Sequence, residues 1–309
     1  MIRRIAIIGL GTMGPGMAAR LARGGIDVVA YDVAAEAIAR APAMLAAADS
    51  VLDALAIGGP AAGGGSVRLT TDLADAVSGA DLVIENVPEN IAIKAEVYRA
   101  IDGLISADTI VASDTSGIPI TKLQAHISNP GRMVGMHWSN PPHIIPMIEV
   151  IAGEATAPAT VAVIRDFIRG LGLLPVLVKK DVPGFVENRV LYALLREVVD
   201  LVERGVIEPE DVDTCVSWGI GYKLAVVGPM ALLDMAGLDI YNSVSTFLNE
   251  DLCDRKDVAP MIGRKIEAGT LGIKSGQGVY SYPRDGIAQL QRDRAQKLVA
   301  IRRILEGRD

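Results

Sequence analysis

The chain has 309 residues, 50% of them hydrophobic, with 30 Lys or Arg against 37 Asp or Glu and a formal net charge of −7. That hydrophobic content excludes a disordered chain, and the length is sufficient for two domains. An acidic chain without a cluster of Lys and Arg is a poor match for nucleic acid, and no apolar run reaches the ~18 to 20 residues of a membrane-spanning helix. We therefore expect a small-molecule partner, without nucleic acid or membrane.

The chain has two cysteines, Cys215 and Cys253. Neither lies in a CxxC motif or beside a histidine, so both are interpreted as ordinary reduced thiols. This cysteine usage favours a cytoplasmic protein.

The first 32 residues predict a dinucleotide-binding unit. An apolar run, IAIIG, ends at Gly9 and predicts a buried parallel strand. A helix-like run from Met13 to Gly24 follows, and then a second strand ends at Asp32. Between strand and helix stands GxGxxG, made of Gly9, Leu10, Gly11, Thr12, Met13 and Gly14. A glycine pattern alone is weak, but this one has the strand, the helix and the acidic residue about 20 positions later that the mechanism requires.

Each part of this pattern has a physical role. Gly9 permits the tight turn, Gly11 lets the backbone approach a pyrophosphate, and Gly14 lets the helix pack close to the sheet. The helix N-terminus then meets the phosphates with free N–H groups. Asp32 would accept hydrogen bonds from the adenosine ribose and repel a 2′-phosphate, and Val33 to Ala35 supply no cation. We expect NAD as the cofactor in preference to NADP.

Six further apolar runs predict strands, with helix-like stretches between them. This alternation predicts an α/β fold with a Rossmann-type, doubly wound parallel sheet. From Pro183 the apolar spacing becomes mostly helical, so we expect a Rossmann domain over 1–182 and a mainly helical C-terminal domain over 183–309. A glycine-rich stretch, 58–66, predicts a loop, and the tail from about Asp285 predicts a helix. The strand segments are 67–71, 81–87, 109–114, 132–137, 147–151 and 174–180.

Eight segments together resemble the 3-hydroxyacyl-CoA dehydrogenase family over nearly the whole chain. They occur in the family's order, which is more specific than any single motif. The segments are GLGTMG, VPENIAIK, SDTSG, HWSNPP, MIEVI, DVPGFVENR, GIGY and KSGQGVYSY. The resemblance implies an NAD-dependent dehydrogenase that forms a homodimer through its C-terminal domain.

The resemblance also assigns the catalytic pair. His137 corresponds to the family's general base, and Glu149 to the carboxylate that orients it. The chemistry fits, because an imidazole titrates near neutral pH and a buried carboxylate fixes its tautomer. Glu149 stands alone in the apolar segment MIEVI, where an unpaired carboxylate would be costly.

Five further residues correspond to family positions around the substrate and the nicotinamide. Ser116 and Asn188 match the residues that hold the substrate oxygen. Asn140 either contacts substrate or shapes the Asn-Pro turn. Glu89 and Lys94 match positions near the nicotinamide, but they are equally interpreted as a solvated Glu–Lys pair.

His143 has no counterpart in the family pattern, and its role stays open between capping the loop and facing the substrate. His137 and His143 lack metal-ligand spacing, and no cysteine or carboxylate cluster joins them, so we expect no metal.

One departure from the family concerns coenzyme A. Acyl-CoA users carry several Lys or Arg after the second strand and helix, whereas this chain has none between Arg40 and Arg68. An anionic CoA tail would find little compensation there, which favours small non-CoA substrates.

Three functions remain open at this point. The overall resemblance is greatest to the branch of the family that oxidises a carboxylate-bearing pyridine aldehyde in vitamin B6 degradation, in which His137 would activate water. The same residues could instead oxidise an alcohol, either a small L-gulonate-like hydroxy acid or a 3-hydroxyacyl-CoA. A third possibility is a non-catalytic NAD-binding structural protein.

Overall fold

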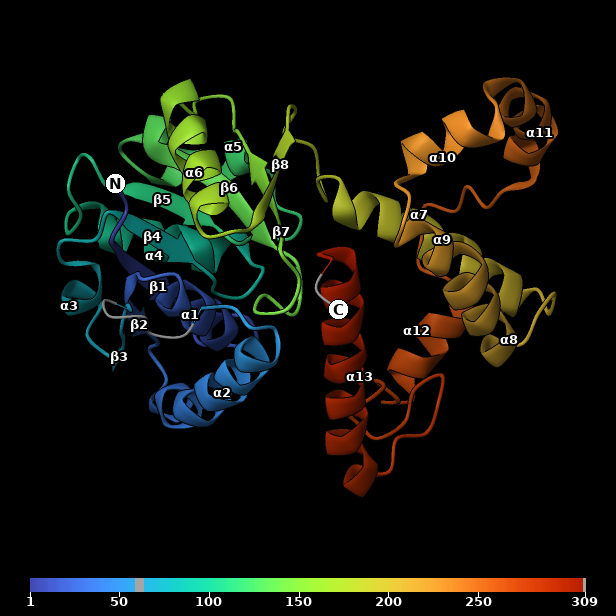
Figure 1. The fold of residues 1–309 in the computed structure, drawn as a ribbon, viewed down its shortest axis with the longest axis horizontal. Helices are drawn as coiled ribbons and strands as arrows, with labels where there is room; N and C mark the ends of the chain where they lie inside the picture. The colour runs from blue at the N-terminus through green and yellow to red at the C-terminus, as the bar shows by residue number, and fades with distance from the viewer. Residues whose placement is uncertain (59–63, 308–309) are drawn as a thin grey trace. The chain divides into compact units, whose positions relative to one another are not determined.

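The computed structural model describes residues 1–58 and 64–307, so most of the predicted glycine-rich loop at 58–66 lies outside the described residues. An eight-stranded sheet organises the first part of the chain in the order β3-β2-β1-β4-β5-β6-β7-β8 (Figure 1). Its strands are β1 (Arg4–Ile8), β2 (Asp27–Tyr31), β3 (Val67–Thr70), β4 (Leu82–Glu85), β5 (Ile110–Ser113), β6 (Met133–Trp138), β7 (Met147–Ile151) and β8 (Leu174–Val178). Every segment predicted as a strand forms one, and the predicted Rossmann-type sheet is confirmed.

The sheet differs from the prediction in the direction of its last two strands. Neighbours from β3 to β6 pair in parallel, but β7 pairs antiparallel with β6, and β8 runs parallel to β7. The reason is the short connection over 139–146, since a parallel crossover needs a dozen or more residues. This reversal aligns His137 on β6 with Glu149 on β7, because the two are register partners.

Helices cover both faces of the sheet, as the alternation of side chains along β1 requires. Ile5 and Ile7 belong to one buried cluster, with side chains from α1 (Gly14–Arg23), α2 (Ala35–Ala54) and α6 (Pro158–Gly170). Ala6 and Ile8 belong to a second cluster on the opposite face. That cluster contains side chains from α3 (Leu73–Val77), α4 (Ile91–Asp102) and α5 (Ile120–Leu123). Short 3₁₀ turns η1 (Gln124–His126) and η2 (Pro130–Arg132) lead into β6.

The chain divides into two compact units, Met1–Arg189 and Val190–Asp309. This division falls seven residues beyond the expected domain boundary at 182/183. The intervening residues stay with the first unit because they bond to it: Gly184 N donates to Gly117 O (3.3 Å), and the Val186 and Glu187 N–H groups donate to Glu149.

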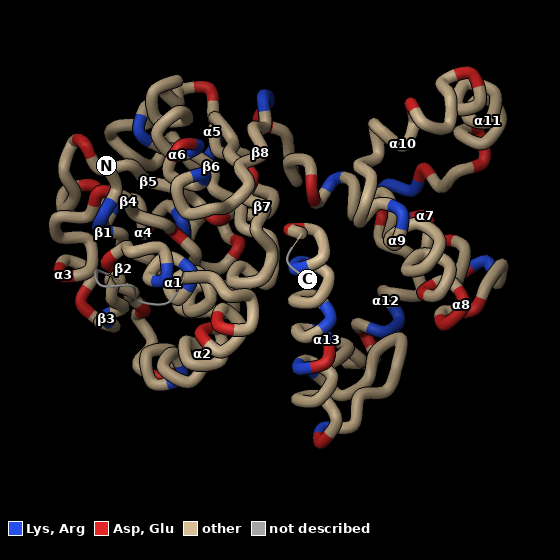
Figure 2. Tube along the Cα trace, in the orientation of Figure 1, with Lys and Arg blue, Asp and Glu red and all other residues tan. Residues whose placement is uncertain are grey.

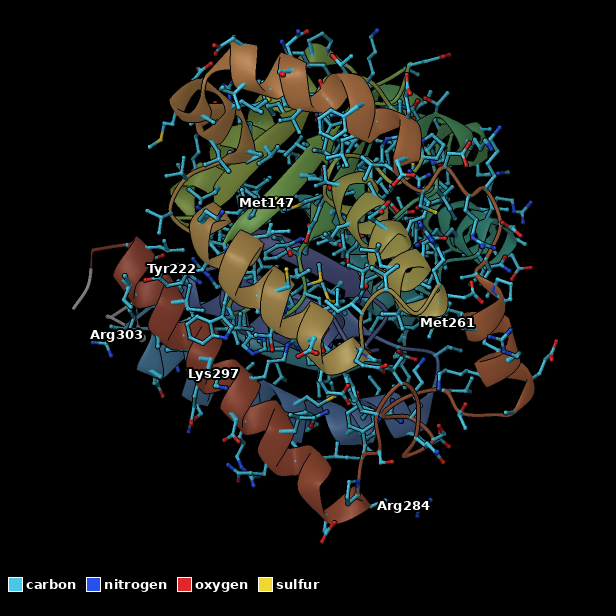
Figure 3. The ribbon with its side chains drawn as sticks, turned by 90° about the vertical axis from the view of Figure 1, so that its right-hand side faces the viewer. Met147, Tyr222, Met261, Arg284, Lys297 and Arg303 are labelled. Atoms are coloured by element: carbon cyan, nitrogen blue, oxygen red, sulfur yellow. The ribbon has the colours of Figure 1, made fainter. Side chains whose placement is uncertain are left out.

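The second unit is helical, as expected from its apolar spacing. The helix α7 (Glu187–Glu203) begins in the first unit and continues into the second. It is followed by α8 (Pro209–Thr214), a π-helical segment η3 (Cys215–Gly221), α9 (Tyr222–Leu224), α10 (Pro229–Ala236), α11 (Leu238–Asp251), α12 (Pro260–Glu267) and α13 (Arg284–Leu305). Figure 3 shows α13 along its length, with Arg284 near one end and Arg303 near the other. The tail predicted as a helix is α13.

Among the described helices, none taken singly is long and apolar enough to cross a membrane. Two neighbouring segments, Pro209–Leu224 and Pro229–Ala236, are together long and apolar enough, but a bend of 88° separates them. Cys215 and Cys253 are free thiols.

Candidate active site

The glycine pattern forms the turn between β1 and α1. Gly9 has a φ of +108°, a conformation that side chains disfavour, and a Cβ there would collide with the backbone oxygen of Asn86. A Cβ on Gly14 would likewise collide with the carbonyl of Gly9, so the helix begins in direct contact with the turn. At Gly11 a Cβ would meet no described atom within 4 Å, which leaves the backbone open to a ligand.

A cavity of about 660 Å³ lies against this turn. Asp32 stands at its edge, after the end of β2. Its Oδ2 accepts from Leu10 N (2.8 Å) and its Oδ1 from Ala34 N (2.9 Å), so the carboxylate is fixed in place. The predicted residues Gly9, Gly11, Thr12, Met13 and Asp32 all line the cavity. The lining also includes residues that the sequence did not assign to cofactor binding: Ile8, Tyr31, Val33, Asn86, Val87, Pro88, Ile93, Glu96 and Val97.

These residues fit a dinucleotide. The open backbone at Gly11 and the N-terminus of α1 suit a pyrophosphate, and the carboxylate of Asp32 suits a ribose diol. Asn86 contributes to the turn from the end of β4, since its Nδ2 donates to Gly9 O (3.2 Å).

The second group of predicted residues is centred on His137 and Glu149. His137 Nδ1 lies 2.8 Å from Glu149 Oε2, and both side chains are buried. The antiparallel pairing of β6 and β7 places the two residues directly opposite one another. The structure thus brings the predicted pair together.

A tight turn after β8 supplies the remaining partners of Glu149. Gly184 and Phe185 both have positive φ, +77° and +50°. The turn directs the next two backbone N–H groups at the carboxylate, so Glu149 Oε1 accepts from Val186 N (2.9 Å) and Glu187 N (3.1 Å). The ring of Phe185 also packs against that of His137, with 5.8 Å between ring centroids.

These contacts shift both pKa values in the direction that favours an ion pair. Burial opposes protonation of His137, but the hydrogen bond to Glu149 and the charges of Asp114, Glu149 and Glu187 outweigh it, so the pKa of the ring lies above its usual value. Burial also opposes ionisation of Glu149. The hydrogen bonds from His137, Glu187 and Val186 outweigh that effect and hold the pKa of the carboxyl below its usual value.

Two further carboxylates lie beside this pair, and neither was predicted from the sequence as a site residue. Asp114 is buried after β5 and accepts from Trp138 N (2.8 Å), and burial raises its pKa to about 7. Glu187 accepts from Ser139 Oγ through Oε1 (2.6 Å). The signal for Glu187 was present in the segment DVPGFVENR, where it immediately precedes Asn188.

Ser116 and Asn188 also come together. The Asn188 side chain donates to the backbone oxygen of Ser116 (2.7 Å), and the Ser116 N–H donates to Glu89 Oε1 (3.1 Å). These two bonds fix the loop that carries Ser116. The Ser116 residue itself is exposed. Asn140 is exposed as well, and its peptide bond to Pro141 is cis.

The interpretation of Glu89 and Lys94 as a solvated pair is wrong. Lys94 is 1% exposed and bonds to Glu85 Oε1 (2.7 Å), while its contact with Glu89 Oε2 is longer, 3.6 Å. Glu85 also accepts from Tyr98 OH (2.5 Å) and Ser113 Oγ (2.7 Å). The cause is tertiary: β4 and α4 pack together, so the lysine faces the sheet rather than solvent.

Glu89 does not act mainly as an ion-pair partner of Lys94; its carboxylate accepts hydrogen bonds from the loop after β5. Glu89 Oε1 accepts from Thr115 Oγ1 (2.7 Å) and from the backbone N–H of Gly117 (2.9 Å) and Ile118 (3.2 Å), besides Ser116. The carboxylate therefore organises the loop that carries Ser116.

His143 packs against the dinucleotide helix. A Cβ on Gly16 of α1 would come within 2.8 Å of His143 Nδ1, and this nitrogen is buried without a hydrogen-bond partner among the described residues. Burial lowers the pKa of the ring. The neutral ring thus forms part of the packing between the Asn-Pro loop and α1.

His137, Glu149 and Glu187 also satisfy a distance test for metal ligands, since one donor atom from each lies within 4.8 Å of the other two. The 2.8 Å separation of His137 Nδ1 and Glu149 Oε2 is that of a hydrogen bond. Metal–ligand bonds of about 2.1 Å at tetrahedral angles would separate these two donors by roughly 3.4 Å. The geometry therefore matches a proton-sharing network.

Much of the described part of the stretch that departs from the acyl-CoA pattern lies in α2. Arg40 is the only Lys or Arg of α2 (Figure 2). Asp49 and Asp53 of this helix both pair with Arg23 of α1, at 3.0 and 2.7 Å. The described residues of α2 therefore offer no cluster of free cations to a polyanion.

Comparisons with known proteins agree with this geometry. Residues 4–182 match the model of the 3-hydroxyacyl-CoA dehydrogenase NAD-binding domain, and residues 184–282 match that of the same family's C-terminal domain. The chain is 77% identical over all 309 residues, and over the whole relative, to 5-formyl-3-hydroxy-2-methylpyridine 4-carboxylate 5-dehydrogenase of Mesorhizobium japonicum.

Two further comparisons place this likeness in context. A crystal structure described as that 5-dehydrogenase, "an NAD+ dependent dismutase", has a TM-score of 0.98 at 77% identity, with full coverage of both chains. A probable 3-hydroxybutyryl-CoA dehydrogenase of Deinococcus radiodurans is 35% identical over 285 residues, which cover 90% of this chain and 100% of the relative.

Proposed function

We propose a substrate and a mechanism from the premise that this chain belongs to the 3-hydroxyacyl-CoA dehydrogenase family. The chain is an NAD-dependent dehydrogenase with a Rossmann-type NAD-binding domain and the family's C-terminal domain. The substrate that we propose is the aldehyde 5-formyl-3-hydroxy-2-methylpyridine 4-carboxylate, oxidised to the corresponding dicarboxylate in vitamin B6 degradation.

The observation that carries this proposal is 77% identity over the full length to a dehydrogenase of that name. The charge on α2 supports it independently. Asp49 and Asp53 occupy Arg23, and no Lys or Arg occurs between Arg40 and Arg68. A small aromatic acid does not need the cations that the phosphates of coenzyme A would require.

In the proposed mechanism His137 acts first, as general base. Its Nδ1 bonds to Glu149, which leaves Nε2 to take a proton from water as the oxygen attacks the aldehyde carbon. The carboxylate of Glu149 stabilises the imidazolium that results. Ser116 and Asn188 lie together at the loop beside Glu89 and would hold the carbonyl oxygen as its negative charge develops.

Bound NAD supplies the hydride acceptor. The turn from Gly9 to Gly14 and Asp32 would hold the dinucleotide, while His137, Ser116 and Asn188 would hold the aldehyde hydrate. Because hydride transfer is reversible, the same residues would reduce a second aldehyde with NADH, and His137 would then act as the acid. This agrees with the word dismutase in the description of the similar crystal structure.

The test is to incubate the purified protein with the pyridine aldehyde and NAD in heavy-oxygen water and to identify the products by mass spectrometry. The proposal predicts a dicarboxylate that contains one oxygen from the water, and the matching alcohol as the product of reduction. Turnover of L-gulonate or 3-hydroxybutyryl-CoA in place of the aldehyde would assign the site to alcohol oxidation. NADH binding without turnover of any of these would indicate a structural protein.

We also propose that the protein is a homodimer formed through its C-terminal domain. Large apolar side chains are exposed on the second unit, more than an isolated surface usually carries. They include Trp218 (73% exposed), Met230 (73%), Met235 (73%), Tyr222 (67%) and Phe247 (64%). Sedimentation velocity should give the mass of two chains, and replacement of Met230 and Phe247 by Asp should give the mass of one. A wild-type monomer would contradict the proposal.

A further inference from the structure

Glu187 is a half-buried carboxylate that the mechanism above does not use. Its Oε1 accepts from Ser139 Oγ (2.6 Å), and its backbone N–H donates to Glu149. Its second oxygen, Oε2, is shielded from solvent and has no hydrogen-bond partner among the described residues. A buried oxygen of a carboxylate is costly to leave unpaired, so such an atom calls for an explanation.

The location of Glu187 suggests what that oxygen does. One carboxylate oxygen of Glu187, one ring nitrogen of His137 and one carboxylate oxygen of Glu149 all lie within 4.8 Å of one another. Ser139 and the backbone bond to Glu149 hold Glu187 on this side of the network. The site therefore contains two candidate proton acceptors, the ring of His137 and the free oxygen of Glu187.

The proposed reaction releases two protons, and these two groups can accept one each. Oxidation of an alcohol by NAD releases one proton besides the hydride. Oxidation of an aldehyde consumes water and gives a carboxylate, NADH and two protons: one leaves as water adds to the carbonyl, and the other leaves the second oxygen of the hydrate. His137 already holds the first proton when the hydride departs, and one imidazole cannot hold both.

We propose that Glu187 is the second proton acceptor of aldehyde oxidation, an inference that rests on the proposed function. In the first step the water oxygen bonds to the aldehyde carbon, the π electrons move to the carbonyl oxygen, and His137 takes the proton. In the second step the C–H bond breaks, its electron pair goes to NAD as hydride, and a C=O bond forms. Glu187 Oε2 takes the proton of the remaining hydroxyl, so the product leaves as a carboxylate.

This assignment distinguishes the two directions of the reaction. Reduction of the aldehyde by NADH adds one hydride and one proton, and His137 alone can supply that proton. As a proton acceptor, Glu187 is therefore needed for oxidation and not for reduction. A purely structural role, such as anchoring Ser139, would affect both directions alike.

The test variant is Glu187→Gln, because the amide oxygen can still accept from Ser139 Oγ while the group loses its basicity. We expect kcat for aldehyde oxidation to fall roughly 10²-fold, the usual loss for a general base. The loss in kcat for aldehyde reduction should be much smaller, because there Glu187 acts only through its charge on His137. Glu187→Asp, which keeps a carboxylate, should recover part of the oxidation rate.

Glu154→Gln is the matched control, since Glu154 is an exposed glutamate on the loop after β7. Equal losses in both directions, or no loss in either, would overturn the assignment to Glu187 while leaving the proposed function in place. If the Gln variant does not fold, the Asp variant decides: oxidation and reduction slowed by the same factor would overturn the assignment. A wild-type protein that oxidises only hydroxy acids would instead remove the proposed function, and this inference with it.

Discussion

Replacing Glu149 with Gln would test how the carboxylate sets the tautomer of His137. The amide oxygen of Gln can still accept from the N–H groups of Val186 and Glu187, as Oε1 does now. The amide nitrogen would then face His137 Nδ1, where a carboxylate oxygen now lies 2.8 Å away. Two donors cannot share that bond, so the ring proton would move to Nε2, the nitrogen that has to take a proton from water.

The size of the effect follows from this contact. A hydrogen bond to a charged group contributes about 1.5–3 kcal/mol, which is roughly a 10- to 150-fold change in rate when the bond stabilises the imidazolium. The wrong tautomer adds to that loss. We expect kcat to fall by roughly 10²-fold or more, and His137→Ala to lose a similar amount. The pKa of the ring should also fall, because the hydrogen bond to Glu149 is the largest effect that opposes the lowering by burial.

The assay is NADH formation from the pyridine aldehyde, followed over pH at saturating cofactor, with NAD affinity measured separately by competition against NADH fluorescence. Wild-type activity should rise with pH as His137 loses its proton, at a pH above the ring's ordinary pKa. In the variant that limb should move to lower pH while NAD affinity stays the same. Turnover equal to that of the wild type, or of Glu154→Gln, would refute the role of the pair.

Three further outcomes follow from the same contacts. Asp32→Ala should weaken NAD binding and relax the rejection of NADP, and an unchanged preference in cofactor titrations would exclude the ribose role. Lys94→Met leaves the buried carboxylate of Glu85 without its cation. It should lower the free energy of unfolding by about 3–5 kcal/mol in chemical denaturation. A stability within error of the wild type would contradict the role of the Lys94–Glu85 pair. The raised pKa of His137 means that its protonation stabilises the fold. That contribution is fully present below about pH 6.5 and is lost as pH rises through the higher folded pKa. The difference in stability between wild type and His137→Gln should therefore shrink across that range. A difference that stays constant with pH would contradict the raised pKa of His137.

The sequence located the parts of the site that depend on local pattern. The turn from Gly9 to Gly14 and the residue Asp32 follow from one strand, one helix and a fixed spacing, so chain geometry alone places them together. His137 and Glu149 were assigned by family resemblance. Their direct opposition additionally requires β7 to reverse, which the short connection between β6 and β7 dictates.

The residues that were missed depend on contacts between distant segments. From the sequence alone, Lys94 is interpreted as a surface residue of a helix. Its burial depends on the packing of α4 on β4, where Lys94 pairs with Glu85. A usable signal existed, because Glu85 is a lone carboxylate in an apolar strand, the same feature that drew attention to Glu149. Glu187 was not predicted, although it precedes Asn188 directly. The turn at Gly184 and Phe185 brings it next to Glu149 and His137.

Side-by-side turnover of three substrates tests the central claim most directly. The pyridine aldehyde, L-gulonate and 3-hydroxybutyryl-CoA would each be incubated with NAD, and NADH formation would be recorded for the wild type and for His137→Ala. The account predicts turnover of the aldehyde alone, abolished in the variant. Turnover of a hydroxy substrate alone would keep the fold, the cofactor and the His137–Glu149 pair, and would contradict aldehyde oxidation.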